Sequence, residues 1–192
     1  MIMPLLGDFE VYTVYDCEQV KDAGPTTLFE VPLGMNNKNY SRTNMVKSKS
    51  LPTPERLLVS SIRMGFLNSN GCGLVPVSDP VYWNSAMRLI IGSKIYWESP
   101  VISAVDPALI LSAGQGYLLM PPAQRAQIEK KLQCWLKSEP VGGAPDRGGW
   151  PRIDGLTIEP GYRFEVTVFG AQRKEPMEVF CCLDGVKLLE VI

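Results

Sequence analysis

The segment GYRFEVTVFG, residues 161–170, has the most regular alternation of side chains in the chain. Every second position carries an aromatic or apolar residue: Tyr162, Phe164, Val166 and Val168. Successive side chains of a β-strand point to opposite faces, so a strand with one buried face has a sequence period of two. Residues 161–170 therefore predict a strand that packs on a hydrophobic core.

The same period recurs in earlier segments. Residues 8–15, 28–32 and 57–66 each alternate in this way, which predicts three further strands. In the last of these, one face is mostly apolar and consists of Leu58, Ser60, Ile62, Met64 and Phe66. The 17 glycines and 16 prolines supply many turns between short strands. The chain is expected to be an all-β protein.

Two dipeptides predict β-hairpins. Gly92–Ser93 stands between two short apolar runs, and Asp184–Gly185 stands between FCCL and VKLL. A glycine supplies the positive φ that a two-residue turn requires, and Asp-Gly is a strong signal for a type I′ turn. We therefore expect the chain to reverse direction at both places.

The adjacent residues Cys181 and Cys182 invite a redox or metal hypothesis. In a strand their side chains point to opposite faces, so they cannot meet at one metal ion without a strained backbone. The five cysteines of the chain are scattered and lack a CxxC spacing, which is not the pattern of a disulfide framework. We expect thiols, with the adjacent pair serving as small buried residues.

Composition narrows the class of protein. At 192 residues, with 45% hydrophobic residues and a net charge of −1, the sequence predicts one ordinary globular domain over residues 1–192. The N-terminal residues lack a secretion signal pattern, so synthesis in the cytoplasm is expected. The chain contains no histidine, the commonest general base near neutral pH and a frequent metal ligand. We expect no enzymatic activity, no cofactor and no metal.

Three segments depart from the strand pattern. Residues 123–137 have the apolar spacing of one short amphipathic helix. Residues 32–55 form a long arm without periodicity, and residues 138–155 form a second, glycine-rich loop. Such long irregular segments in a compact domain are usually functional loops or segments that dock on another molecule.

The arm and the glycine-rich loop are the candidate contact regions. Lysine and arginine side chains are spread along the arm, but their density is too low in a nearly neutral protein to favour a nucleic-acid partner. Aromatic and methionine residues are enriched at the centres of protein interfaces. The predicted partner-contact residues are Lys38, Tyr40, Arg42, Met45, Lys47, Lys49 and Trp150.

A sugar-binding site is the main alternative. Aromatic platforms beside carboxylates bind sugars. Two places offer that combination: Tyr96 and Trp97 with Glu98, and Trp150 with Asp146 and Asp154. A glycosidase would in addition need two carboxylates that face each other across a cleft, for example Glu98 and Asp154.

Four short sequence segments follow one another in the chain: LFEVPLG (28–34), TNM (43–45), LPTPERLLVSSIRM (51–64) and IIGSKIYWESP (90–100). This order resembles small structural proteins of tailed bacteriophage virions, which decorate or cement the capsid shell and are often built on a jelly roll. The later segment EPGYRFEVTVFG (159–170) also resembles a late jelly-roll strand preceded by a turn.

The resemblance implies a jelly-roll-like antiparallel β-sandwich with one short amphipathic helix. It implies a non-enzymatic virion protein that bridges neighbouring shell subunits. Capsid or other virion proteins would be its partners, with homo-oligomers expected and membranes excluded. The alternative within the same setting is a carbohydrate-binding or receptor-binding sandwich domain of a virion.

Overall fold

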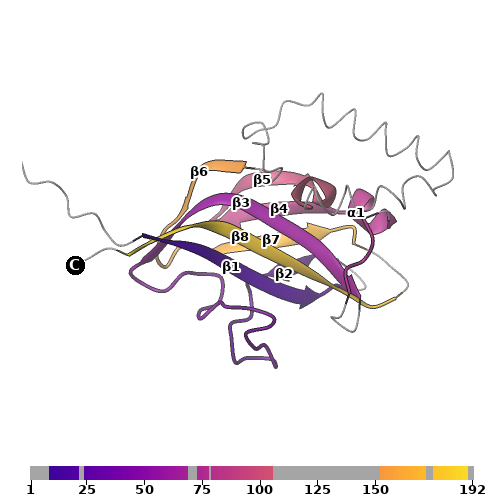
Figure 1. Ribbon diagram of the computed structural model, residues 1–192, viewed down its shortest axis with the longest axis horizontal. Coiled ribbons are helices and arrows are strands. Elements are labelled where there is room, and N and C mark those ends of the chain that lie inside the picture. Colours follow the sequence, from indigo (N-terminus) through magenta and orange to yellow (C-terminus); the bar gives the residue numbers. More distant parts are fainter. Residues whose placement is uncertain are drawn as a thin grey trace, which may run out of the picture.

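The protein is a sandwich of two antiparallel sheets (Figure 1). The computed structural model describes residues 9–21, 24–68, 73–77, 79–105, 152–171 and 175–189. The strands are β1 Phe9–Gln19, β2 Thr26–Leu28, β3 Glu55–Asn68, β4 Ala86–Ile91, β5 Lys94–Pro100, β6 Arg152–Ile158, β7 Phe164–Phe169 and β8 Met177–Leu189. The described helices are α1 Pro80–Asn84 and the 3₁₀ helix η1 Val101–Ala104.

The strand order is that of a jelly roll. One sheet has the order β1-β8-β3-β6 and the other β2-β7-β4-β5. Early strands pair with late ones in a nested manner: β1 with β8, β2 with β7, β3 with β6 and β4 with β5. Eight strands wrapped in this way form the two packed sheets of a jelly roll. The expected all-β sandwich is confirmed.

The core lies between the two sheets. The alternation in β7 is confirmed, because Phe164, Val166 and Val168 are all buried. They face residues of the other sheet such as Ile62 and Leu183, which are also fully buried. Burying each such side chain contributes about 2 kcal/mol, so these inward rows are the main stabilising term of the fold.

A β-bulge changes which residues of β3 face the core. The register shifts between Val59 and Ser61, so Leu57 and Val59 are buried before the bulge and Ile62 after it. Leu58, which strict alternation places on the same face as Ile62, is 39% exposed. The predicted face was therefore wrong at the start of β3, because an extra residue in one strand moves the following side chains to the other face.

The two predicted hairpins have opposite outcomes. Gly92–Ser93 is a tight turn: Ile91 pairs with Lys94, and Gly92 has a φ of 62°. Asp184–Gly185 is not a turn, because β8 runs straight through it between β1 and β3. The prediction of a hairpin there was wrong.

Two neighbouring strands keep Gly185 extended, and they leave no room for a side chain at this position. It pairs with Tyr12 of β1 on one side and with Val59 of β3 on the other. A Cβ atom on Gly185 would lie 2.1 Å from the backbone oxygen of Leu58, beside the bulge. The glycine thus permits the close approach of a bulged neighbour, a role that glycine commonly has inside a strand.

Three further expectations concern the strand at 28–32, the glycine-rich loop and the helix. The strand expected at 28–32 ends at Leu28. Residues 152–155, which were expected to belong to the glycine-rich loop, are part of β6, and residues 138–151 lie outside the described residues. The helix expected at 123–137 lies outside the described residues.

The described helix α1 was not predicted; it begins after Asp79, whose side chain accepts a hydrogen bond from the backbone N–H of Val81. Across the described residues, no helix has the length and apolar composition to cross a bilayer.

Candidate functional site: the arm between β2 and β3

The arm comprises residues 32–55. Phe29, just before the arm, and Lys49, within it, are hydrogen-bonded to each other where the arm meets the sandwich, and this pair is called the neck. Both residues have positive φ angles, 66° and 54°. The backbone N–H of Lys49 donates to the backbone oxygen of Phe29 at 2.7 Å. The backbone N–H of Phe164 in β7 donates to the backbone oxygen of Lys49 at 2.6 Å. Positive φ is unfavourable for residues of this kind and persists where surrounding contacts impose it. The neck therefore holds the arm in one orientation.

Lys38 fixes the arm to the inner side of β1. Its ammonium group lies 2.5 Å from a carboxylate oxygen of Asp16 and 2.5 Å from one of Glu18. Asp16 also accepts a hydrogen bond from the backbone N–H of Phe29. Asp16 is 1% exposed and Lys38 5%. Burial raises the pKa of Asp16, and the contacts with Lys38 oppose that shift. Removing one partner of such a buried pair costs about 3–5 kcal/mol.

Arg42 makes a second ionic contact, on the outer side of the same sheet. Its guanidinium group donates to the carboxylate of Glu178 in β8. The thiol of Cys17 donates to the same carboxylate at 3.5 Å. Burial and the adjacent Glu178 charge raise the pKa of Cys17 to about 12. Cys17 is thus held as a neutral thiol, and Arg42 is committed to the chain's own β8.

Asn44 covers part of the free edge of β1. Its side-chain oxygen accepts from the backbone N–H of Tyr15 at 2.9 Å, and its side-chain nitrogen donates to the backbone oxygen of Thr13 at 2.7 Å. The adjacent Thr43 forms a bridge with Asp16. The amide of Asn44 thus replaces a neighbouring strand. Covered edges are protected from pairing with other chains.

The structure divides the predicted contact residues into two groups. Lys38, Met45 and Lys49 are buried. Met45 belongs to the core, and Lys49 binds Glu165 at 2.6 Å and Glu30 at 3.1 Å. These side chains serve the chain's own fold, and Arg42 is partly buried against β8.

The second group consists of side chains of the arm that are exposed to solvent. Tyr40 is 72% exposed and Lys47 is exposed, as are two apolar residues that were not singled out, Met35 and Val46. The hydroxyl group of Tyr15 donates to the backbone oxygen of Tyr40, which fixes the position of that residue. Trp150 lies outside the described residues. The contact hypothesis therefore rests on Met35, Tyr40, Val46 and Lys47.

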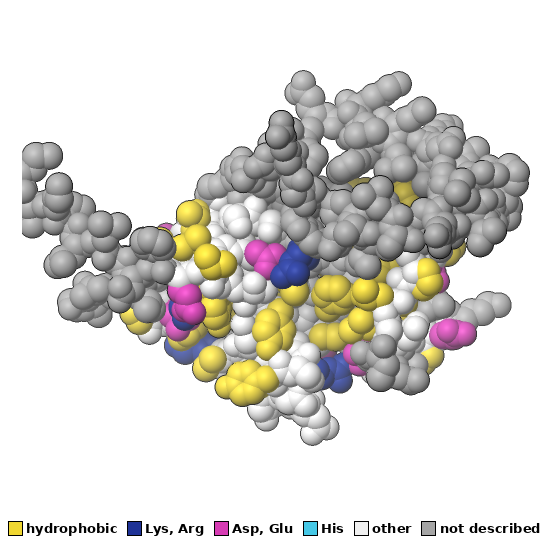
Figure 2. All heavy atoms as spheres, viewed as in Figure 1, with side chains coloured by type: hydrophobic (Ala, Val, Ile, Leu, Met, Phe, Trp, Pro, Cys, Tyr) yellow, Lys and Arg dark blue, Asp and Glu magenta, His cyan; other side chains and the backbone are white. Residues whose placement is uncertain are grey.

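The outer face of the β1-β8-β3-β6 sheet carries a saturated polar cluster. Asp184 of β8 accepts two hydrogen bonds from Arg63, at 2.6 and 2.7 Å, and one from Thr13 at 2.7 Å. Burial would raise the pKa of Asp184, but these hydrogen bonds outweigh it and the pKa is lowered. Figure 2 shows charged side chains among hydrophobic ones on this side of the molecule. The cluster joins three strands.

Two of the residues named for a sugar-binding or glycosidase site, Trp97 and Glu98, have contacts within the chain. Trp97 packs partly buried against the core, and the Glu98 carboxylate is paired with Arg88 at 2.8 Å. The ammonium of Lys94 lies 4.9 Å from the ring centre of Tyr96. The side chain of Asp154 lies outside the described residues. Within the described part of the chain, no group of three metal-ligating side chains comes together.

The adjacent cysteines occupy opposite faces of β8, as predicted. Cys181 is fully buried toward the core, whereas Cys182 is half-buried. Both are free thiols. Burial raises the pKa of Cys182 to about 11 and that of Cys181 well above its ordinary value. Because the thiolate is the reactive form of cysteine, burial disfavours the reactive form of both residues.

Comparison of the chain with protein-family models, with curated proteins and with solved structures finds no match.

Proposed function

We propose that this chain is a non-enzymatic structural protein of a tailed-phage virion that decorates or cements the capsid shell by bridging neighbouring subunits. The observation that carries the proposal is an arm held rigidly by its neck and by Lys38, with Tyr40 at 72% exposure beyond those anchors. A cement protein acts by burying surface across neighbouring subunits, and many repeated weak contacts then act together.

The rigid attachment supports binding by the arm. A flexible arm loses conformational entropy when it docks, at about 1–2 kcal/mol for each backbone residue that becomes ordered. An arm already fixed by Asp16, Glu18 and Asn44 has lost most of that entropy on folding. Burial of the exposed Tyr40 and Met35 against a partner can then contribute to affinity.

Co-sedimentation of the purified chain with phage shells stripped of their accessory proteins tests the proposal. The wild-type chain should pellet with the shells, and Tyr40→Ala should weaken binding by about tenfold because tyrosine is a frequent interface anchor. Tyr96→Ala is the matched control, since Tyr96 is also exposed but lies on β5 of the other sheet. No binding by the wild type, or equal loss in both variants, would contradict the proposal.

A further inference from the structure

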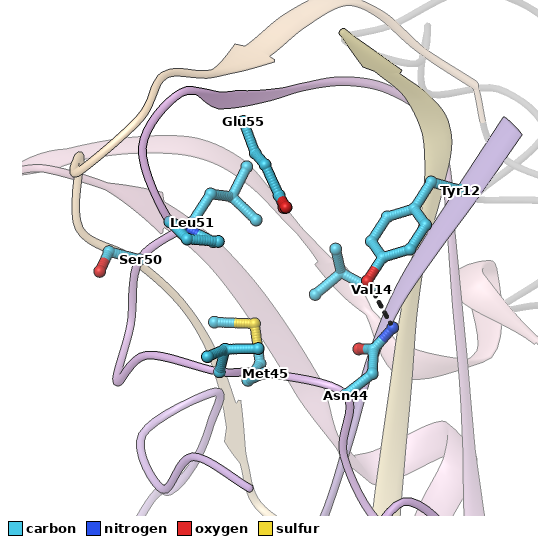
Figure 3. A pocket seen from close by; sticks show the side chains of 9 residues that line it. Tyr12, Val14, Asn44, Met45, Ser50, Leu51 and Glu55 are labelled. Atoms are coloured by element: carbon cyan, nitrogen blue, oxygen red, sulfur yellow. Dashed lines mark hydrogen bonds between the residues drawn. The ribbon is translucent and has the colours of Figure 1, made fainter. Parts of the chain in front are cut away.

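A small pocket lies between the arm and the beginnings of β1 and β3 (Figure 3). Its volume is about 50 Å³. Val14, Met45 and Leu51 line it and are at most 4% exposed, so its inner wall is apolar. Binding sites for small molecules usually measure about 300–1,000 Å³. This pocket has room for one narrow side chain.

The polar groups of the pocket lie on its other side. Figure 3 shows the carboxylate of Glu55 pointing into the space beside Val14, with the ring of Tyr12 nearby. The hydroxyl of Tyr12 accepts a hydrogen bond from Asn44 at 3.3 Å. The ion pair of Glu55 is with Lys187 at 3.8 Å, which is too long for a hydrogen bond. The Glu55 carboxylate can therefore accept a further donor.

The local charge is negative. The ammonium of Lys187 lies 3.7 Å from Glu10 and 3.8 Å from Glu55. Among the described residues, one positive charge between two carboxylates leaves one negative charge uncompensated, and a partly enclosed site weakens its screening by water. A fitting occupant has a slender apolar stem for the inner wall and a positive charge at its end for Glu55.

We propose that this pocket binds the side chain of a lysine from a partner protein. The methylene groups of the lysine pack against Val14, Met45 and Leu51, and its ammonium group donates to Glu55. Lysine suits this space because its ammonium is compact, whereas the guanidinium of arginine is a broad planar group. The proposal relies on the proposed function only for the partner being a virion protein.

The test uses two short peptides with the isolated chain, followed by NMR. Acetyl-Gly-Lys-Gly-amide supplies the lysine, and acetyl-Gly-norleucine-Gly-amide supplies a similar stem without the charge. The lysine peptide should shift the amide signals of Met45, Leu51 and Glu55 saturably, with an affinity at least about tenfold above that of the norleucine peptide. Equal affinities, or no saturable shift with either peptide, would overturn the proposal.

Two variants separate charge recognition from a structural effect. Glu55→Gln should lower the affinity for the lysine peptide by at least about tenfold, and Lys187→Gln should raise it several-fold by removing a competing cation. Glu98→Gln, a remote carboxylate, should leave it unchanged. A Glu55→Gln chain that still folds and binds normally would contradict the proposal, as would Lys187→Gln binding more weakly.

One further outcome decides the source of the lysine. Lys47 is exposed on the arm next to Val46, which lines the pocket. If a dilution series shows that the chain self-associates and Lys47→Gln abolishes this, the occupant is Lys47 of a second copy, and the assignment to a different partner protein is overturned. Peptide binding and shell co-sedimentation are independent measurements, so the failure of one leaves the other result standing.

Discussion

Gly92–Ser93 and Asp184–Gly185 carry similar local turn signals and do opposite things. Gly92 closes the β4–β5 hairpin at the edge of a sheet, where a Cβ atom would have nothing within 4 Å. Gly185 lies in a strand with a partner on each side, where a Cβ atom would meet the backbone of Leu58. Glycine thus provides a positive φ at position 92 and permits the close approach of a neighbouring strand at position 185. Two neighbouring strands outweigh a local preference for turning.

Replacing Gly185 should have the largest effect. In Gly185→Ala the new Cβ would lie 2.1 Å from the backbone oxygen of Leu58, beside the bulge in β3. We expect the free energy of unfolding to fall by about 3 kcal/mol or more, because the backbone of β3 at Leu58 and Val59 must shift. Urea denaturation monitored by the four tryptophans measures it. A loss under about 1 kcal/mol would show that β3 adapts easily and that Gly185 does not differ from Gly92.

Asp184 should have an intermediate effect. Asp184→Asn keeps the side-chain shape but removes the charge that Arg63 binds. We expect a loss of about 1–2 kcal/mol, reduced from the value of a buried pair because both side chains are partly exposed. The same denaturation experiment measures it, with Glu98→Gln as a control at an exposed cross-strand pair.

The pH dependence of that loss provides a check on its cause. The folded pKa of Asp184 is lowered, so its contribution is complete above the pKa of the unfolded chain, about 3.9, and is lost as pH falls through the folded value. The stability difference between wild type and Asp184→Asn should be constant from pH 7 to about 5 and shrink below about 4. A difference that persists unchanged at pH 2 would mean that shape and not charge sets it.

Gly92 should have the smallest effect. Gly92→Ala meets no atom, so its cost is the strain of a φ near 62° alone, about 1 kcal/mol. Gly92→Asn should cost less, because asparagine tolerates this conformation better. Thermal unfolding of the two variants side by side measures the difference. A larger loss for Gly92→Ala than for Gly185→Ala would reverse the comparison.

The candidate site was only partly predictable. The sequence identified the arm as a segment without periodicity, but it offered Lys38, Met45 and Lys49 as contact residues, and these are buried. Their partners lie far away in the chain or in other elements, as Glu165 does for Lys49. One signal was available: Asp16 follows Val14 at the strand period, which places a carboxylate on the buried face and requires a cation beside it.

What the sequence determined by itself is what depends on near neighbours. The period of two specified β7 and the opposite faces of Cys181 and Cys182, and Gly92–Ser93 specified a hairpin, because strand alternation and backbone angles are local properties. The tertiary structure decided the rest. The burial of Lys38 depends on the fold of the arm, which brings it to Asp16 and Glu18 of β1. The straight path of β8 and the bulge in β3 depend on which segments lie opposite one another, and residues over a hundred positions apart supply those contacts, as Thr13 and Asp184 do.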